Sequence, residues 1–386
     1  MRICAIGLRG IPDVMGGIET HCEQLYPRLA GLDDKLDIVV IGRSGYVSDN
    51  AFGNVRVKTV WAPRHKVLET LVHTPLAILY ARIFLHPKIV HLHGIGPGFF
   101  APLARLLGFR VVGTHHAIDY ERPKWKGLGR LFLQSGEWML ANFSNEVICV
   151  SRTIETSLSN RFPTTRGRLV TIRNGAPAKP VAAAASADPL RQFGLTPRGY
   201  ILAVGRLDPT KGFHDLVRAF ELARPAGLKL VIAGAVPVND PYATRLQQSA
   251  SDSVVFVGRQ PAEQVRALYD KAALFVHPSY MEGFPLVLME ALASDAPMLV
   301  SDIDPHQEVD LGSDSYFKAG NVEQLAARLS QGGYDRLRCV RRADILREND
   351  WGDIARRHHA IMVRQVQRGP VRKDAPAVHR TGGLGG

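Results

Sequence analysis

The chain has 386 residues, of which 46% are hydrophobic and 22% are charged, and its formal net charge is +12. This composition excludes a disordered or fibrous protein, and the length exceeds that of a usual single core, so we expect two domains. The four cysteines show no paired spacing, which argues against a disulfide framework and against a zinc knuckle.

The chain opens with an apolar strand pattern over Arg2–Gly7 that runs directly into a glycine-rich loop. We expect no signal peptide here, and therefore cytoplasmic residence. The loop lacks the G-x-G-x-x-G pattern of dinucleotide-binding proteins, which disfavours a nicotinamide enzyme. Gly16 and Gly17 instead indicate close approach of the backbone to a ligand, with Glu19 and Thr20 at the start of a helix; an ordinary flexible turn is the alternative.

Positive charge is concentrated in the first half of the chain. Residues 1–180 hold 23 Lys and Arg against 13 Asp and Glu, whereas residues 181–386 hold 25 against 23. Residues 54–130 alone hold 12 basic and 3 acidic side chains, near Trp61 and Trp125. This pattern fits an anionic bilayer or an anionic lipid-linked substrate, and a merely solvated basic face stays open. Nucleic acid is disfavoured because the sequence has no helix-turn-helix, zinc-finger or RNA-recognition signature.

Short apolar strand patterns alternate with helical patterns through the first half, which predicts a parallel sheet covered on both faces. The longest apolar region, Val67–Leu85, is interrupted by Glu69, His73 and Arg82, so we expect no membrane span there. The expected strands are Arg2–Gly7, Asp37–Ile41, Val55–Thr59, Ile89–Leu92, Arg110–Thr114 and Glu146–Val150.

Two histidines and an aspartate follow the strand Arg110–Thr114. We expect one of His115 and His116 to be structural and the other to lie at the mouth of a cleft, with Asp119 nearby. None of the paired histidines along the chain has helical i, i+4 spacing with a carboxylate between, so we expect no metal site.

A second strand series predicts a second doubly wound sheet. We expect an N-terminal domain at 1–176, an Ala- and Pro-rich linker at 177–198, and a C-terminal domain at 199–350. A last helix is expected at 351–366, whereas 367–386 cannot bury a core and is expected to be disordered. The strands of the second sheet are expected at Tyr200–Val204, Lys229–Ala233, Ser253–Val257, Ala273–His277 and Pro297–Ser301.

Two cations follow the strand Tyr200–Val204. Sheets of this kind bind ligands where loops leave the carboxyl ends of the strands, and Arg206 and Lys211 lie in such a loop. An arginine fork together with a lysine point charge is suited to clamping a diphosphate.

A polar loop and an apolar helix follow the strand Ala273–His277. We expect the helix to begin at Gly283-Phe284-Pro285, because proline fits the first helical turn, and its free N–H groups suit a phosphate. Glu282 precedes this helix, and Glu290 lies within it and needs partners such as ribose hydroxyls. A glycosidase pair is disfavoured because eight helical residues rise about 12 Å, against about 5–9.5 Å between catalytic carboxyls. An ordinary strand-loop-helix unit is the alternative.

These motifs together resemble the retaining glycosyltransferases of family 4, which have the GT-B fold, from residue 1 to about 366. Asn174-Gly175 resembles the family's Asn-Gly at the domain junction, and Trp351 resembles the tryptophan that opens its final helix, which crosses back onto the first domain. The run from His116 to Trp125 is similar to a rhamnosyltransferase-like branch met among exopolysaccharide enzymes.

The resemblance implies a role for each site residue. Glu290 would hold the ribose, and Arg206 and Lys211 would hold the diphosphate. Glu282 would contact the transferred sugar, which His116 would face from the first domain. The backbone of Gly283, Phe284, Pro285 and Leu286 would assist at the diphosphate, and Gly16 and Gly17 would line the acceptor side. Ala117 departs from the glycine usual after this histidine.

The activity implied is transfer of a sugar from a nucleotide-sugar donor to a saccharide or lipid-linked acceptor at the inner face of the cytoplasmic membrane, with retention of configuration. Fixed cations and a helix N-terminus would stabilise the leaving diphosphate, so we expect no metal and no cofactor. A sugar-nucleotide epimerase or phosphorylase of similar fold, and a non-catalytic nucleotide-sugar binding module, are the alternatives.

Overall fold

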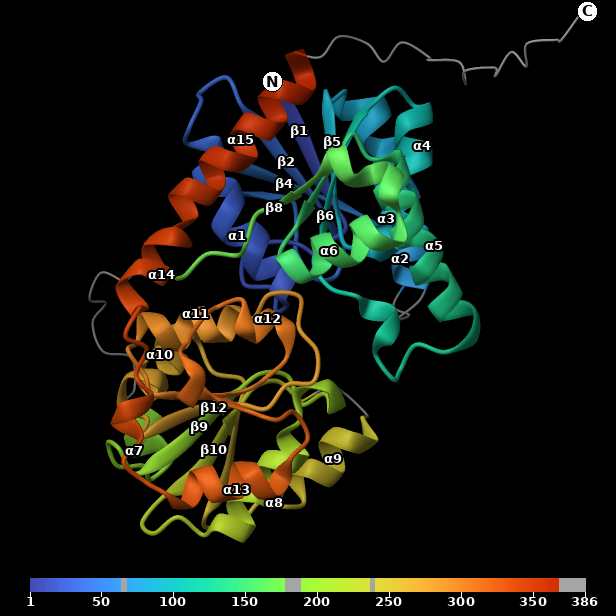
Figure 1. Cartoon of the computed structure of the whole chain (residues 1–386). Coiled ribbons are helices and arrows are strands. Elements are labelled where there is room, and N and C mark those ends of the chain that lie inside the picture. Colours follow the sequence, from blue (N-terminus) through green and yellow to red (C-terminus); the bar gives the residue numbers. More distant parts are fainter. Residues whose placement is uncertain (64–67, 178–188, 237–239, 368–386) are drawn as a thin grey trace, which may run out of the picture.

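The computed structural model describes residues 1–63, 68–177, 189–236 and 240–367. These residues form two α/β lobes, one above the other, each with helices on both faces of a sheet (Figure 1). The final helix, α15 (Trp351–Gln367), leaves the lower lobe and runs along the upper one, where it contacts α1 (Gly17–Ala30). The predicted pair of Rossmann-like domains with a last helix that crosses back is confirmed.

An eight-stranded sheet forms the centre of the N-terminal lobe. Its order is β3-β4-β2-β1-β5-β6-β7-β8, and only β3 and β4 pair antiparallel. Its strands are β1 (Arg2–Ile6), β2 (Asp37–Arg43), β3 (Asn50–Phe52), β4 (Val55–Val60), β5 (Ile89–His93), β6 (Arg110–His115), β7 (Glu146–Cys149) and β8 (Leu169–Thr171). Besides α1, its helices are α2 (Leu68–Tyr80), η1 (Ala81–Leu85), α3 (Ile95–Gly98), α4 (Ala101–Leu106), η2 (Asp119–Glu121), α5 (Gly127–Phe143), α6 (Arg152–Arg161) and η3 (Pro163–Arg168).

A six-stranded parallel sheet forms the centre of the C-terminal lobe, with the order β11-β10-β9-β12-β13-β14. Its strands are β9 (Tyr200–Val204), β10 (Lys229–Ala233), β11 (Val254–Gly258), β12 (Leu274–His277), β13 (Met298–Ser301) and β14 (Tyr316–Phe317). Its helices are α7 (Pro189–Gln192), η4 (Pro209–Lys211), α8 (Phe213–Ala223), α9 (Pro241–Gln247), α10 (Ala262–Lys271), α11 (Leu286–Ala293), α12 (Asp304–Gln307), η5 (Ser313–Ser315), α13 (Val322–Ser330), η6 (Tyr334–Leu337) and α14 (Arg342–Glu348).

Side chains of the central strands alternate between the two faces of each sheet. In β1, Ile3 and Ala5 pack in the cluster that includes α1 and α15, whereas Cys4 and Ile6 pack in the cluster that includes α2, α4 and α5. Burial on both faces explains why these strands read as unbroken apolar runs.

Each sheet has a point where the chain changes its direction of winding. β1 lies between β2 and β5 in the first sheet, and β9 lies between β10 and β12 in the second. Loops that leave the carboxyl ends of such neighbouring strands diverge and open a crevice for a ligand. The Gly16-Gly17 loop follows β1, the Arg206 loop follows β9 and the Glu282 loop follows β12, so the predicted motifs lie at the two crevices.

The apolar segment Leu68–Leu85, formed by α2 and η1, is long and apolar enough to cross a membrane by length and composition alone. In the structure its inner face packs in the N-terminal core, where Ala77, Ile78 and Ala81 are fully buried. Glu69 is buried as well and pairs with Arg43 at 2.9 Å. The segment is therefore a component of the N-terminal lobe.

Two of the predicted boundaries fall partly outside the described residues. Of the predicted linker 177–198, residues 178–188 lie outside, but 189–198 include α7 and bury Leu190 and Leu195 against the C-terminal core. The C-terminal lobe thus includes residues from 189 onward, ahead of the predicted start at 199. The predicted disordered tail, 367–386, lies outside the described residues except for Gln367, the last residue of α15.

Candidate functional site

The loop after β9 presents Arg206 and Lys211 at the carboxyl end of the C-terminal sheet. Its short helix η4 is capped by Asp208, whose carboxylate accepts from the Thr210 amide at 3.0 Å. Gly212 has φ +66°, and a Cβ there would lie 2.2 Å from the Pro278 carbonyl oxygen. Only glycine therefore lets the β9 and β12 loops pack together at the crevice.

Arg206 carries a partly buried guanidinium that forms no hydrogen bond or ion pair within the described ranges. Burial, then the charge of Arg122, lowers the pKa of Arg206 from its usual range, and Arg9 acts in the same direction. Arg9 and Arg122 belong to the N-terminal lobe, so cations of that lobe act on Arg206 of the other, although Asp208 and Asp119 partly offset them. An anion between them would relieve this repulsion, as a diphosphate would. The sequence analysis gave neither Arg9 nor Arg122 a role.

Glu282 is the centre of a compact polar cluster. Lys211 Nζ lies 2.5 Å and His277 Nε2 lies 2.7 Å from the same carboxylate oxygen of Glu282. Although burial opposes ionisation, Lys211 and His277 hold the pKa of Glu282 well below its usual range. The structure thus joins Lys211 and Glu282, which the sequence analysis assigned to separate parts of the donor, and adds His277 as a third member.

Helix α11 begins at Leu286, so the predicted start at Gly283-Phe284-Pro285 was wrong. Pro285 is the N-cap residue, with extended backbone at φ −81° and ψ 101°, and no side chain caps the helix. Proline at this position ends the loop instead of entering the helix. The N–H groups of Leu286 and Val287 donate to no residue that the structure describes and are available to an anion, whereas the Leu288 N–H donates to the Pro285 carbonyl at 3.1 Å.

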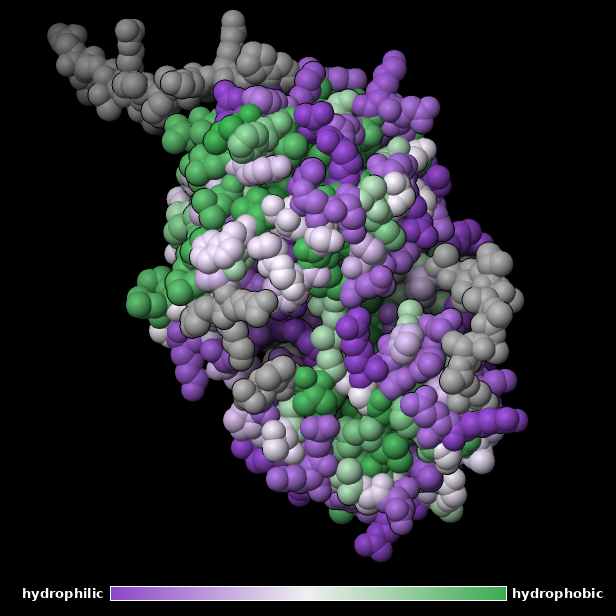
Figure 2. Space-filling view, turned by 180° about the vertical axis from the view of Figure 1, so that it is seen from behind, coloured by the Kyte–Doolittle hydropathy of each residue, from purple (hydrophilic) through white to green (hydrophobic). Residues whose placement is uncertain are grey.

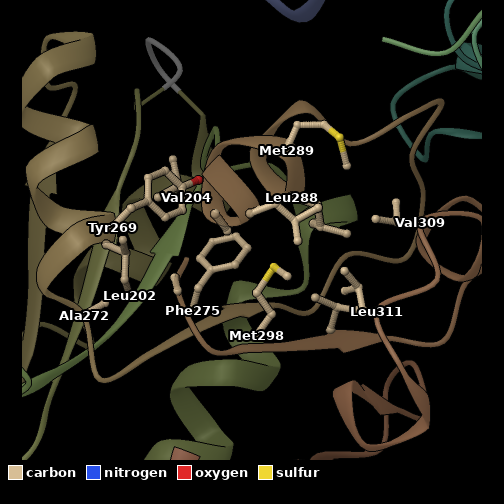
Figure 3. Close-up of a cluster of buried hydrophobic side chains, with 14 of the residues drawn as sticks. Leu202, Val204, Tyr269, Ala272, Phe275, Leu288, Met289, Met298, Val309 and Leu311 are labelled. Atoms are coloured by element: carbon tan, nitrogen blue, oxygen red, sulfur yellow. The ribbon is translucent and has the colours of Figure 1, made fainter. Parts of the chain in front are cut away.

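Glu290 extends from α11, which is anchored from below by Leu288 packing with Phe275 and Met298 (Figure 3). Burial raises the pKa of Glu290 to about 7, and a hydrogen bond from the Tyr269 hydroxyl at 3.2 Å opposes this. The second carboxylate oxygen accepts no hydrogen bond from residues that the structure describes. It is therefore free for a ligand hydroxyl.

His115 and His116 have different environments. His115 Nε2 lies 2.9 Å from the buried carboxylate of Glu137, which also accepts from the Tyr120 hydroxyl at 3.1 Å. His116 is partly exposed, and its Nε2 lies 3.0 Å from His93 Nδ1. His115 is therefore a buried part of the fold, whereas His116 is the more exposed of the pair; its role at the mouth of a cleft stays a prediction.

A chain of hydrogen bonds runs inward from His116. His93 Nε2 contacts the Tyr26 hydroxyl at 2.5 Å, and that hydroxyl contacts His91 Nδ1 at 2.9 Å. Burial, then the neighbouring histidines, holds the pKa of His93 and His116 well below the usual range, so both are neutral. Sequence patterns did not reveal this series of hydrogen bonds because its members come from separate elements.

Two groups within the described part of the chain have the geometry to hold a metal ion. Nitrogens of His21, His93 and His116 lie within 4.8 Å of one another, as do ligand atoms of His277, Glu282 and His306. The spacing of these residues in the sequence revealed neither group. In both, protein hydrogen bonds already engage some of the ligand atoms.

The two lobes touch at Gly283. A Cβ there would lie 1.6 Å from the His116 carbonyl oxygen and 3.4 Å from Ala117 Cα, so the Glu282 loop packs directly on the histidine loop. This contact brings the predicted donor loop and the predicted sugar-facing histidine to one place.

Gly16 and Gly17, predicted to line the acceptor side, lie at the start of α1. Gly16 is the N-cap residue, and a Cβ on Gly17 would meet nothing within 4 Å, so space is open there. Glu19 is buried and accepts from the Arg9 amide at 3.0 Å, which fixes the loop instead of facing a ligand.

The predicted domain-junction residues are also brought together. Asn174 Oδ1 lies 2.8 Å from His21 Nδ1. A Cβ on Gly175 would lie 2.7 Å from the Trp351 ring, so the start of α15 packs on the junction.

Two family models match the chain, one in each lobe. Residues 15–179 match "Glycosyltransferase Family 4" and residues 191–336 match "Glycosyl transferases group 1". Among curated proteins, an uncharacterized glycosyltransferase of Methanocaldococcus jannaschii is 26% identical over 80% of this chain and 82% of its own length. An Escherichia coli O-antigen chain mannosyltransferase B is 24% identical over 75% of this chain and 76% of its own.

Solved structures share the arrangement of both lobes. Sucrose-phosphate synthase from Thermosynechococcus elongatus superposes with a TM-score of 0.78 at 22% identity, covering 95% of this chain and 99% of its own. Anabaena HepE in complex with UDP and glucose superposes with a TM-score of 0.72 at 17% identity, covering 94% of this chain and 100% of its own.

Proposed function

Because this chain is a glycosyltransferase with the GT-B fold, we propose that it transfers a sugar from a nucleotide-sugar donor, with retention of configuration, to a lipid-linked saccharide. The observation that carries this proposal is the set of groups around the crevice of the C-terminal lobe: unpaired Arg206, the Lys211–Glu282 pair and the uncapped start of α11. These groups are matched to a diphosphate with a sugar beside it.

The donor would bind across the end of the C-terminal sheet. Glu290 accepts hydrogen bonds from the ribose hydroxyls through its free oxygen. Arg206 and the first-turn amides of α11 contact the diphosphate, and Lys211 moves between Glu282 and the phosphate oxygens. The relative HepE is described with UDP and glucose, which supports a uridine donor in this fold.

Transfer requires separation of charge at the sugar. As the bond to the diphosphate breaks, positive charge develops on the ring and negative charge on the leaving oxygen. Arg206 and the amides stabilise the negative charge most at that moment. The leaving phosphate oxygen accepts the proton of the attacking hydroxyl on the same face, which gives retention without a separate base, a metal or a cofactor.

His116 and Glu282 position the transferred sugar. Both lie beside the contact between Gly283 and the His116 carbonyl, so the sugar would occupy the boundary of the two lobes. Neutral His116 can accept a hydrogen bond from a sugar hydroxyl or donate one to it, and it introduces no charge. Closure of the lobes aligns the acceptor and excludes water.

The biological setting we propose is surface polysaccharide synthesis, such as exopolysaccharide, in the cytoplasm at the inner face of the membrane. The similarity to an O-antigen mannosyltransferase and the His116–Trp125 run support this setting. The two glycosyltransferase models account for both lobes, so an epimerase or a binding module is not favoured.

A donor panel tests the proposal. Thermal shifts with UDP-, GDP- and dTDP-sugars identify the nucleotide, and mass measurement of the product formed from cell lipid extract, with and without EDTA, identifies the reaction. We expect one sugar to be added to a lipid-linked saccharide at an unchanged rate in EDTA. Conversion of the donor sugar without any acceptor would instead show an epimerase.

A further inference from the structure

Exposed apolar side chains gather on one side of the N-terminal lobe. Of the eighteen large hydrophobic residues that are exposed in the described structure, eleven lie between residues 61 and 143. Figure 2 shows hydrophobic surface along the left margin of the upper lobe. Because this view is turned by 180°, that margin corresponds to the right side of Figure 1, where α2, α4 and α5 lie. Contacts of α4 with both α2 and α5 make these helices neighbours.

The outer face of α2 and η1 is apolar. Leu76, Leu79, Ile83 and Phe84 follow helical spacing and are 39%, 40%, 60% and 64% exposed. A surface helix of a water-soluble domain normally carries polar residues on its outer face. Here Arg82 is the charged side chain among them, so this face is not suited to water alone.

Helices α4 and α5 extend the apolar surface. Leu106 at the end of α4 and Leu128 in the first turn of α5 are each 84% exposed, and Leu131 and Trp138 of α5 are 58% and 46% exposed. We call the outer residues of α2, η1, α4 and α5 the apolar ridge.

Cations border the apolar ridge, and acids are nearly absent. Exposed Lys126 and Arg130 alternate with Leu128 and Leu131 at the start of α5. Acidic residues within 68–143 are four: Glu69 and Glu137 are buried in ion pairs, Asp119 pairs with Arg122 and Glu121 is exposed. Arg64 and Lys66, part of the basic region seen in the sequence, lie outside the described residues.

We propose that the apolar ridge docks on an anionic lipid bilayer, with its leucines, Ile83, Phe84 and Trp138 at the boundary of headgroups and acyl chains and with Lys126 and Arg130 on the lipid phosphates. Apolar and cationic side chains on one face are the combination that interfacial binding uses. The segment lies on the bilayer and does not cross it, because the inner face of α2 is part of the core.

A second copy of the chain fits this face less well. A twofold dimer places the same patch on both subunits, so the Lys126 and Arg130 of one copy would face those of the other without compensating acids. An anionic membrane neutralises this charge.

One end of the apolar ridge lies close to the Arg206 loop. Lys124, just before α5, is near enough to Arg206 that their charges interact. Docking would therefore hold the N-terminal lobe with its crevice beside the membrane, where the lipid-linked acceptor of the proposed function is anchored. The choice of acceptor rests on the proposed function, whereas the docking itself does not rest on it.

Vesicle sedimentation tests the docking. The full chain is mixed at low and at high salt with vesicles of phosphatidylcholine, either alone or with phosphatidylglycerol. Wild type is compared with the double variants Ile83→Gln/Phe84→Gln and Lys126→Gln/Arg130→Gln. The control is Leu222→Gln, because Leu222 is exposed on α8 of the other lobe. We expect wild type and control to bind the anionic vesicles. Each cation removed should weaken binding about fivefold, and the apolar pair at least tenfold.

Other outcomes are distinguishable. Equal sedimentation of all four proteins, or none in any vesicle, overturns the docking. A vesicle-free dimer that the Ile83→Gln/Phe84→Gln variant abolishes assigns the ridge to a second copy instead. Donor hydrolysis without vesicles should match wild type in every variant, so loss of the proposed activity and loss of docking are separate readouts, and thermal midpoints check that each variant is folded.

Discussion

Glu282 links the parts of the proposed donor site. Its carboxylate holds Lys211 and His277 at one oxygen, and its ionised form is stabilised by both. Without a ligand, Lys211 is neutralised, whereas Arg206 has no anionic partner among the residues described. The free protein thus keeps one cation paired and one unpaired. We expect the two to contribute differently to binding and to turnover.

Arg206→Ala should reduce kcat/KM by about 10²–10³-fold, since it removes a cation that acts on the leaving diphosphate. Lys211→Ala should do the same and should also leave Glu282 with only His277 as a partner. The exposed Arg218→Ala on α8 is the matched control. Steady-state kinetics with the identified donor measure the effect, and thermal unfolding shows whether the fold is kept. Near-normal turnover in either variant would remove that residue from the mechanism.

Glu290 should make the stability of the donor-free protein pH-dependent. Its pKa is about 7 in the folded chain against an ordinary 4.5, so the native state binds the proton more tightly and loses stability as the pH rises through 4.5 to about 7. In Glu290→Gln this loss should disappear, so the variant should melt at a higher temperature than wild type at pH 8 and at the same temperature near pH 4.5. Each kcal/mol of difference in the free energy of unfolding shifts the melting temperature by ~2–4 °C.

Bound nucleotide should reverse that order. Ribose hydroxyls donate to the carboxylate, so UDP, GDP or dTDP should stabilise wild type more at pH 8 than at pH 5 and should stabilise Glu290→Gln less. Differential scanning fluorimetry across this range measures both effects, with exposed Glu263→Gln as control. If nucleotide raises the melting temperature of Glu290→Gln as much as that of wild type at both pH 5 and pH 8, Glu290 does not contact the ribose.

The elements show where a sequence suffices. Central strands such as β1, β9 and β10 were predicted to within a residue, because burial on both faces leaves an unbroken apolar run. The short edge strand β3 and the two-residue β14 were not predicted, since they are too short to show a period. A helix was correctly predicted at α11, but its first residue was predicted wrongly, because proline fits both an N-cap and a first turn.

Gly283→Ala should impair the contact between two loops while sparing each lobe. A methyl group there would collide with the His116 carbonyl oxygen, so the lobes must separate locally, and misplacement of about 1 Å can lower turnover about 10²-fold. Nucleotide binding, which we propose uses the C-terminal lobe, should change by only a few-fold. Gly167→Ala, where a Cβ meets nothing within 4 Å, is the control. Wild-type kcat in Gly283→Ala would show that the two loops need not approach.

At the scale of the whole molecule, the site is a product of two lobes, and this is what the sequence could not supply. Arg206, Lys211, Glu282 and Glu290 could be proposed from the sequence because each follows a strand or lies on a helix with a local signal. Arg9 and Arg122 have no such signal, yet the fold brings their charges to Arg206. The same holds for His93, which becomes a partner of His116 only after β5 and β6 pair.

Glu308 joins the two lobes through a second set of contacts. Positioned just after α12 of the C-terminal lobe, its carboxylate accepts from the Arg152 amide at 2.9 Å and the Thr153 amide at 2.6 Å, at the start of α6 in the N-terminal lobe. Arg173 adds a cation at 3.5 Å. A carboxylate at a helix N-terminus is stabilised by free amides and by the helix dipole, so this contact favours the arrangement of the lobes seen in the structure.

Glu308→Gln should therefore shift the chain toward an open arrangement. Hydrogen bonds to a charged group contribute about 1.5–3 kcal/mol, and each 1.36 kcal/mol lost from closure lowers kcat/KM by up to tenfold. Small-angle scattering should show a larger radius of gyration without donor, and saturating donor should restore compactness. Glu348→Gln is the matched control, since Glu348 pairs with Arg341 inside the C-terminal lobe at 3.4 Å. If Glu308→Gln and Glu348→Gln give the same scattering curve and the same kcat/KM, closure does not depend on this carboxylate.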